Sequence, residues 1–65
     1  MESKKKILDL IARMDGIDRL KDLQDVLHDF AQLAMNDGRD HDFNDFCECE
    51  NACHRRILEL EGADK

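Results

Sequence analysis

The chain is 65 residues long and 40% of its residues are charged, with sixteen Asp and Glu against ten Lys and Arg, a formal net charge of −6. A surplus of negative charge repels nucleic acid and anionic membranes, which argues against direct binding to either. A chain of this length forms at most one domain, so residues 1–65 are treated as a single unit.

The composition favours helix over sheet. Pro, Trp and Tyr are absent and Val26 is the only valine. Leu, Ile, Val and Phe supply 16 of the 65 residues, which is enough for a folded core but a thin one. Such a core nets only about 3 to 5 kcal/mol, so chains of this size usually gain stability from disulfides, a metal, a second copy or a larger partner.

The first predicted helix covers residues 3–14, with Ser3 as its N-cap. Its apolar face consists of Ile7, Leu10, Ile11 and Met14. Asp15 and Gly16 follow, and they indicate either a helix stop with glycine in the left-handed conformation or a new N-cap at Asp15. The apolar pattern shifts phase at Leu20, which favours a break or sharp bend near Gly16 over one straight helix.

The second predicted helix covers residues 17–35 and ends before Gly38. Its apolar residues form a stripe wide enough to contact two neighbours: Leu20, Leu23, Leu27, Phe30, Ala31 and Ala34, flanked by Val26 and Leu33. The third predicted helix covers residues 43–61, with Asp42 as N-cap and Gly62 as its end. Its apolar face comprises Phe46, Cys49, Cys53, Ile57 and Leu60.

These patterns predict an all-α fold, either a small antiparallel helical hairpin or a three-helix bundle, completed by dimerisation. The width of the second stripe leads us to predict a homodimer at micromolar concentration. Asp9 and Arg13 interrupt the apolar run near the N-terminus, so the sequence predicts neither an export signal nor a membrane span. An odd number of cysteines and no export signal then predict a cytoplasmic protein with free thiols.

A cluster of zinc-type ligands stands in the third predicted helix: Cys47, Cys49, Cys53 and His54. Structural zinc sites draw paired cysteines from turns, whereas this C-x-C-x3-C-H run lies on a helix. Cys49 and Cys53 share the apolar face, while Cys47 and His54 project from the opposite edge. We therefore interpret Cys49 and Cys53 as apolar core residues. Metal binding, or a redox or intermolecular disulfide role, is the alternative.

Two carboxylate and histidine pairs lie at helical spacing, Asp25 with His28 and Glu50 with His54. They lack the additional glutamates of a metal site in a helical bundle, so ordinary surface histidines are the simpler interpretation. Ser3 is the only serine, threonine is absent and no glycine-rich phosphate loop exists. We expect no enzyme activity and no cofactor.

The most informative pattern is an acidic ridge on the second predicted helix, formed by Asp18, Asp22, Asp25 and Asp29. Their spacing of four, three and four residues places all four carboxylates on one face, opposite Leu20 and Leu27. Like charges at this spacing weaken a helix slightly, so helix stability alone does not explain the ridge. It serves either to keep the chain soluble or to dock on a basic partner.

The leading hypothesis is a non-catalytic interaction protein, a small helical regulator or inhibitor that self-associates or docks on a larger protein. The acidic ridge is its candidate partner-binding surface, and a basic, nucleic-acid-binding protein is the partner whose charge would fit. The rival hypothesis is a thiol-based metal or redox sensor that uses Cys47, Cys49, Cys53 and His54.

Overall fold

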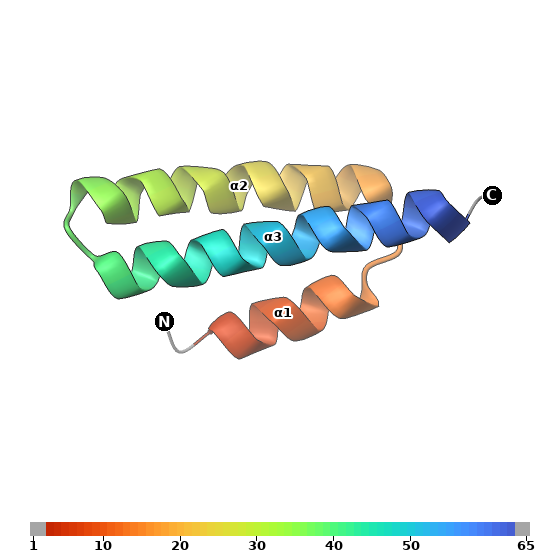
Figure 1. Ribbon diagram of the computed structural model, residues 1–65, viewed down its shortest axis with the longest axis horizontal. Helices are drawn as coiled ribbons and strands as arrows, with labels where there is room; N and C mark the ends of the chain where they lie inside the picture. Colours follow the sequence, from red (N-terminus) through yellow and green to blue (C-terminus); the bar gives the residue numbers. More distant parts are fainter. Residues whose placement is uncertain (1–2, 64–65) are drawn as a thin grey trace.

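The computed structural model of the chain describes residues 3–63, and these residues form three α-helices without a strand. The helices are α1 (Lys4–Arg13), α2 (Ile17–Asn36) and α3 (Asp40–Ala63). The predicted all-α class is therefore confirmed, in the form of a small three-helix bundle (Figure 1).

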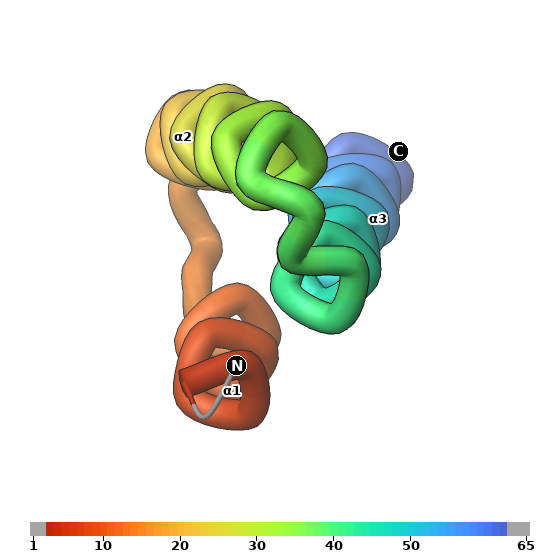
Figure 2. The backbone as a smooth tube through the Cα atoms, turned by 90° about the vertical axis from the view of Figure 1, so that its left-hand side faces the viewer, coloured from red at the N-terminus to blue at the C-terminus, as the bar shows by residue number. Residues whose placement is uncertain are grey.

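The longest helix, α3, is the centre of the bundle. It packs along α2 in antiparallel orientation and along α1 in parallel orientation, and the α2–α3 contact is the more extensive of the two (Figure 1). α1 and α2 make little direct contact with each other. Figure 2 shows both of these helices beside α3 and apart from one another.

One apolar cluster joins the three helices. Its buried members are Ile11, Leu20, Leu27, Cys49, Cys53 and Ile57. Ala31 and Ala34 of α2 are also buried, and side chains this small allow α2 to approach α3 closely. The predicted apolar face of α3 is thus confirmed, and its two central cysteines act as small core residues.

The apolar face of α1 differs from the prediction at one position. Ile11 is buried as expected, but Leu10 is 54% exposed, while Leu8 packs against the core cluster. The reason is that α1 packs mainly on α3, so its buried face turns toward Leu8 and away from Leu10. The spacing of apolar residues indicates one apolar stripe on this helix, but it does not specify on which side of the helix α3 packs.

The predicted break near Gly16 is confirmed, because residues 14–16 are not helical and Gly16 is the N-cap of α2. Its backbone is extended, with φ −86° and ψ 112°, so the glycine is not in the left-handed conformation and Asp15 is not the N-cap. Ser3 is the N-cap of α1, as predicted, but its side chain makes no capping hydrogen bond. Neither Ser3 nor Asp15 therefore caps a helix with its side chain.

The third helix is longer than predicted at both ends. Gly38 adopts a left-handed conformation with φ 73° and turns the chain sharply, so α3 begins at Asp40 and not after Asp42. Asp40 and Asp42 then both lie in the first turn, where the helix dipole favours negative charge. Gly62 lies inside α3 and does not end it, since a glycine can also adopt helical backbone angles.

Polar contacts fix the position of α1 along α3. The Lys4 Nζ atom lies 2.7 Å from Glu48 Oε2 at one end. At the other end, Arg56 Nε donates to the Met14 carbonyl at 3.0 Å and Arg56 Nη2 donates to Asp15 Oδ1 at 3.1 Å. These contacts hold the α1–α2 connection against α3, although α1 itself buries little surface.

Among residues 3–63, none of the helices combines the length and the apolar character that crossing a bilayer requires. This finding agrees with the composition, in which charged residues interrupt every apolar run.

The first prediction concerns stability and rests on Leu20, which is completely buried. Leu20→Ala leaves a cavity at the centre of the bundle and should lower the free energy of unfolding by about 2 to 5 kcal/mol. Since a chain of this size has about 3 to 5 kcal/mol in total, most of the variant should be unfolded at room temperature.

The matched control is Leu58→Ala, because Leu58 is 52% exposed on α3 and its loss should cost about 0.5 kcal/mol or less. Urea denaturation followed by circular dichroism measures both variants. Equal losses for the two would contradict the packing of the core around Leu20.

Candidate interaction surface

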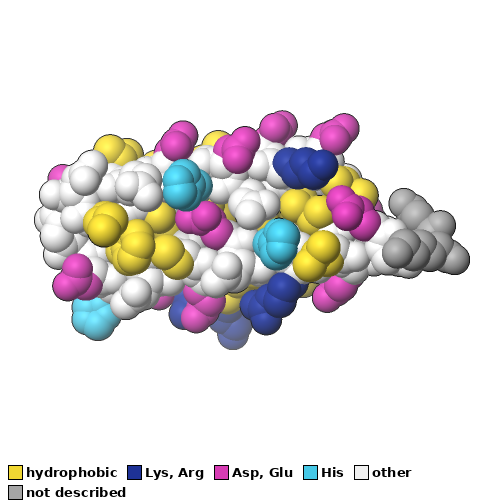
Figure 3. All heavy atoms as spheres, turned by 45° about the horizontal axis from the view of Figure 1, so that its top comes forward, with side chains coloured by type: hydrophobic (Ala, Val, Ile, Leu, Met, Phe, Trp, Pro, Cys, Tyr) yellow, Lys and Arg dark blue, Asp and Glu magenta, His cyan; other side chains and the backbone are white. Residues whose placement is uncertain are grey.

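The four carboxylates of the acidic ridge are exposed on α2, opposite the residues that α2 buries against the bundle. Figure 3 shows acidic side chains following one another along the edge of the molecule that α2 forms. The structure thus places Asp18, Asp22, Asp25 and Asp29 together on one solvent-facing side of the helix, as their spacing predicts.

The ridge is not neutralised from within the molecule. Within the described part of the chain, residues 3–63, none of its four carboxylates pairs with a lysine, arginine or histidine. Other acidic residues do pair: Asp15 with Arg56 at 3.1 Å and Asp37 with Arg39 at 3.5 Å. The mutual repulsion along the ridge is therefore not offset by a local ion pair.

An apolar stripe lies beside the ridge on the same helix and consists of Leu23, Val26, Phe30 and Leu33. Val26 and Phe30 are each 48% exposed and Leu33 is 55% exposed, whereas Leu23 is half-buried against the core. The sequence pattern assigned Phe30 to the buried stripe, and this assignment is wrong. The small Ala31 faces α3 instead, and consecutive residues point about 100° apart around a helix.

Phe30 retains one aromatic contact at the edge of the bundle. Its ring stacks on Phe46 of α3 with the ring centroids 5.6 Å apart and an angle of 19° between the planes. This contact fixes the side chain while about half of its surface stays in water. The apolar stripe is consequently an ordered surface with an aromatic residue at its centre, which is the composition of many protein interfaces.

The cysteine cluster is divided between the core and the edge of α3. Cys49 and Cys53 are completely buried, Cys47 is half-buried and His54 is exposed. All three cysteines are free. Among residues 3–63, no three His, Cys, Asp or Glu side chains lie close enough together to hold a metal ion. The four candidate metal ligands therefore do not converge, as the helical spacing indicated.

The surroundings of the thiols suppress their reactivity. Burial, together with the neighbouring Cys49 and Glu50, raises the pKa of Cys53 to about 11. Burial is also the main cause that raises the pKa of Cys49 and of Cys47, with nearby carboxylates adding to the effect. Because the thiolate is the nucleophile and the metal ligand, these shifts make the cysteines less reactive than a thiol in water.

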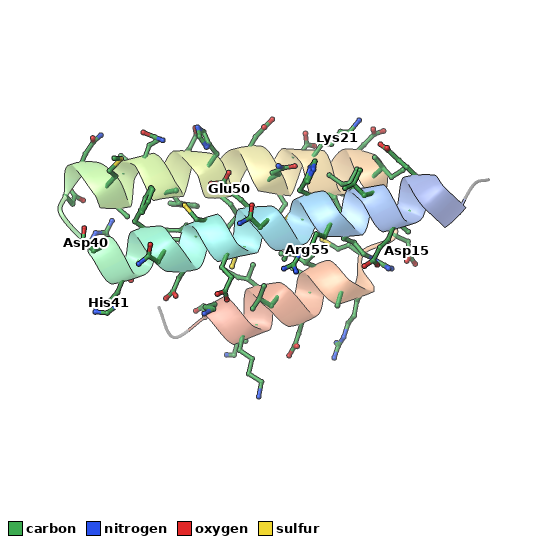
Figure 4. The ribbon with its side chains drawn as sticks, viewed as in Figure 1. Asp15, Lys21, Asp40, His41, Glu50 and Arg55 are labelled. Carbon is green, nitrogen blue, oxygen red and sulfur yellow. The ribbon has the colours of Figure 1, made fainter. Side chains whose placement is uncertain are left out.

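One histidine forms a contact between two helices. His28 Nδ1 of α2 lies 3.4 Å from Glu50 Oε2 of α3, so one member of each carboxylate and histidine pair noted in the sequence meets the other across the α2–α3 contact. Figure 4 shows Glu50 on the side of α3 that turns toward α2. The spacing of residues along one helix carries no signal for this contact, which depends on the relative position of α2 and α3.

A shallow hollow of about 250 Å³ lies between α1 and α3, over Ala12 and Ala52. Arg55, Arg56 and Glu59 form its polar side, and Figure 4 shows Arg55 beside α1. Arg56 Nη1 already donates to Glu59 Oε2 at 3.2 Å. The hollow contains no nucleophile and is smaller than the ~300 Å³ at which ligand pockets begin.

Comparison of the chain with protein-family models, with curated proteins and with solved structures gives no match.

The second prediction concerns the relative reactivity of the three thiols. Cys47 should react fastest with a maleimide in the folded protein, because Cys49 and Cys53 are completely buried. The measurement is time-resolved mass spectrometry on three variants that each keep one cysteine and carry alanine at the other two positions. Equal and rapid labelling of all three thiols would show that α3 is not packed as described.

The third prediction concerns alkaline pH. The pKa of Cys53 is about 11 in the folded chain against an ordinary value of 9.0, so the thiol releases its proton more easily after unfolding. Stability from this group is complete below about pH 9 and should fall as the pH rises toward 11. Urea denaturation between these pH values measures the slope. In Cys53→Ala the slope should be shallower, and an unchanged slope would contradict the assignment.

Proposed function

We propose that this chain is a non-catalytic interaction module that docks on a larger protein through α2. The observation that supports this proposal is the position of the acidic ridge directly beside the exposed apolar stripe on one helix. Apolar contact supplies the affinity of such a surface, and charge supplies the choice of partner and the rate of encounter. The partner that fits is a protein with a basic surface, such as one that otherwise binds nucleic acid.

A regulatory or inhibitory role follows from the charge of the ridge. Its four carboxylates have no internal partner among residues 3–63, so a basic surface that docks on them breaks no existing ion pair. A small acidic protein bound in this way covers the basic residues that its partner would use for phosphates. The proposed outcome of docking is therefore to block the partner's nucleic-acid surface.

The thiol-based alternative is the weaker proposal. A metal or redox sensor needs accessible thiols with a lowered pKa, whereas Cys49 and Cys53 are buried and their pKa values are raised. The three free thiols fit a reducing compartment, and a cytoplasmic location is part of the proposal.

The fourth prediction tests the ridge through the double variant Asp22→Asn, Asp25→Asn. The partner is first recovered from the source cells by capture on the immobilised chain. The variant should associate with this partner more slowly than the wild type does, and its association rate should depend less on salt concentration. The effect should be largest in dilute buffer, because the screening length is only about 8 Å at physiological salt. Kinetic titrations at several ionic strengths measure both quantities.

The matched control is Asp9→Asn, Glu61→Gln, which also removes two exposed carboxylates but leaves the ridge intact. This control should bind at nearly the wild-type rate. If the ridge variant and the wild-type chain associate at the same rate in low salt, the ridge serves solubility alone and the proposed function is wrong.

A further inference from the structure

Two apolar features on the outer helices α1 and α2 are exposed and have no cover within residues 3–63. One is the apolar stripe of α2, and the other is Leu10 of α1, which is 54% exposed. Both helices pack on α3 and make little contact with each other, so no described helix lies over either feature. Ordered apolar surface of this kind on a chain with so thin a core marks an interaction site.

The exposed apolar residue of α1 stands between two basic residues. Lys6 lies four residues before Leu10 and Arg13 lies three residues after it, so the three side chains share one helical face. Lys6 and Arg13 are exposed, and neither forms an ion pair with another residue in the range 3–63. We refer to Lys6, Leu10 and Arg13 as the basic face of α1.

The surface of α2 carries the complementary pattern. Asp22 lies four residues before Val26 and Asp29 lies three residues after it, which repeats the spacing of the basic face with the opposite charge. An α1 helix laid antiparallel on α2 would place Lys6 against Asp29 and Arg13 against Asp22. The same alignment would place Leu10 against Val26, so two ion pairs would flank one apolar contact.

Contacts within the chain place these two patterns at the same height along the bundle. For α1, Lys4 contacts Glu48, and Asp15 contacts Arg56. α1 therefore runs parallel to α3, at an offset of about 42 residues, which puts Lys6 and Arg13 beside positions near 48 and 55.

For α2, His28 contacts Glu50 at 3.4 Å and Phe30 stacks on Phe46. α2 runs antiparallel to α3, so Asp29 and Asp22 also lie beside positions near 48 and 55. The basic face of α1 and the acidic residues of α2 thus lie at matching heights along the bundle. Both sets of side chains are exposed and none of them pairs within residues 3–63, and α1 and α2 make little contact with each other.

We propose that a second copy of the chain covers this surface, related to the first by a two-fold axis parallel to the helices. Such an axis leaves the height of every residue unchanged, so the basic face of α1 in each copy meets Asp22, Val26 and Asp29 of the other. The two apolar stripes then pack against each other near the axis. The contact is isologous, as expected for a two-fold dimer, and it occurs twice.

This inference rests on the proposed function, because it names a second copy as one basic surface that the acidic ridge accepts. Dimer and partner complex use the same carboxylates and therefore exclude each other. Self-association sets the concentration of chains whose acidic ridge is unoccupied. A partner whose surface carries more positive charge than the basic face of α1 displaces the second copy.

The fifth prediction is a charge-exchange experiment with two full-length variants, Lys6→Glu, Arg13→Glu and Asp22→Lys, Asp29→Lys. Each variant alone brings like charges together at both contacts and should have a dimer dissociation constant about ten-fold or more above that of the wild type. An equimolar mixture restores opposite charges at both contacts and should form a heterodimer. Sedimentation equilibrium at micromolar concentration in low salt measures all three samples.

The control Lys5→Glu, Lys21→Glu changes the net charge by the same amount as the first variant, at exposed positions outside the two patterns, and should remain a dimer. Circular dichroism verifies that each variant is helical. Should the double reversal unfold α1, Lys6→Gln, Arg13→Gln replaces it, and an unweakened dimer in this variant would overturn the proposal.

A wild-type chain that stays monomeric throughout the micromolar range, or a mixture that stays monomeric while both variants are folded, would also overturn the proposed dimer. Either result would remove the second copy as a competitor for the ridge, while the comparison of wild type and ridge variant against the larger partner would remain a separate test. Conversely, unchanged partner rates in Asp22→Asn, Asp25→Asn would remove the proposed function and leave the mixing result standing, so the two failures are distinguishable.

Discussion

The packing of α2 against α3 is the contact on which the rest of the structure depends. Ala31 and Ala34 on one helix and Cys49 and Cys53 on the other are all buried, and none of these side chains is large. Small residues let the two helices approach closely, and this approach decides which neighbouring side chains fit between them. Since Ala31 is buried and consecutive residues point about 100° apart around a helix, Phe30 lies at the edge against Phe46 and half of it remains in water.

Apolar packing and polar contacts together hold α1 on α3. Ile11 is buried in the core cluster, while Lys4 contacts Glu48 at one end and Arg56 donates to the Met14 carbonyl at the other. Because α1 packs on α3 and hardly touches α2, the outward faces of both helices remain available.

The four carboxylates of the acidic ridge share one face of α2, although both outer helices carry charges of both signs. α1 has Asp9 among its basic residues, and α2 has Arg19 and Lys21. None of the ridge carboxylates forms an ion pair among residues 3–63. A row of like charges on one exposed face is an arrangement that a second molecule of opposite charge can complement.

The sequence alone determined the helices, the break at Gly16, the buried cysteines of α3 and the common face of the acidic ridge. Each of these follows from the spacing of residues along the chain, which for the break is the phase shift of the apolar pattern at Leu20. The tertiary structure decided what spacing cannot specify. Leu8 and not Leu10 packs against the core, and Ala31 and not Phe30 is buried. His28 contacts Glu50 across the α2–α3 contact. The tertiary structure also decided that the basic face of α1 and the acidic residues of α2 lie at matching heights along the bundle. These features depend on the side from which a neighbouring helix approaches and on its offset, and both are set by contacts between residues far apart in the chain.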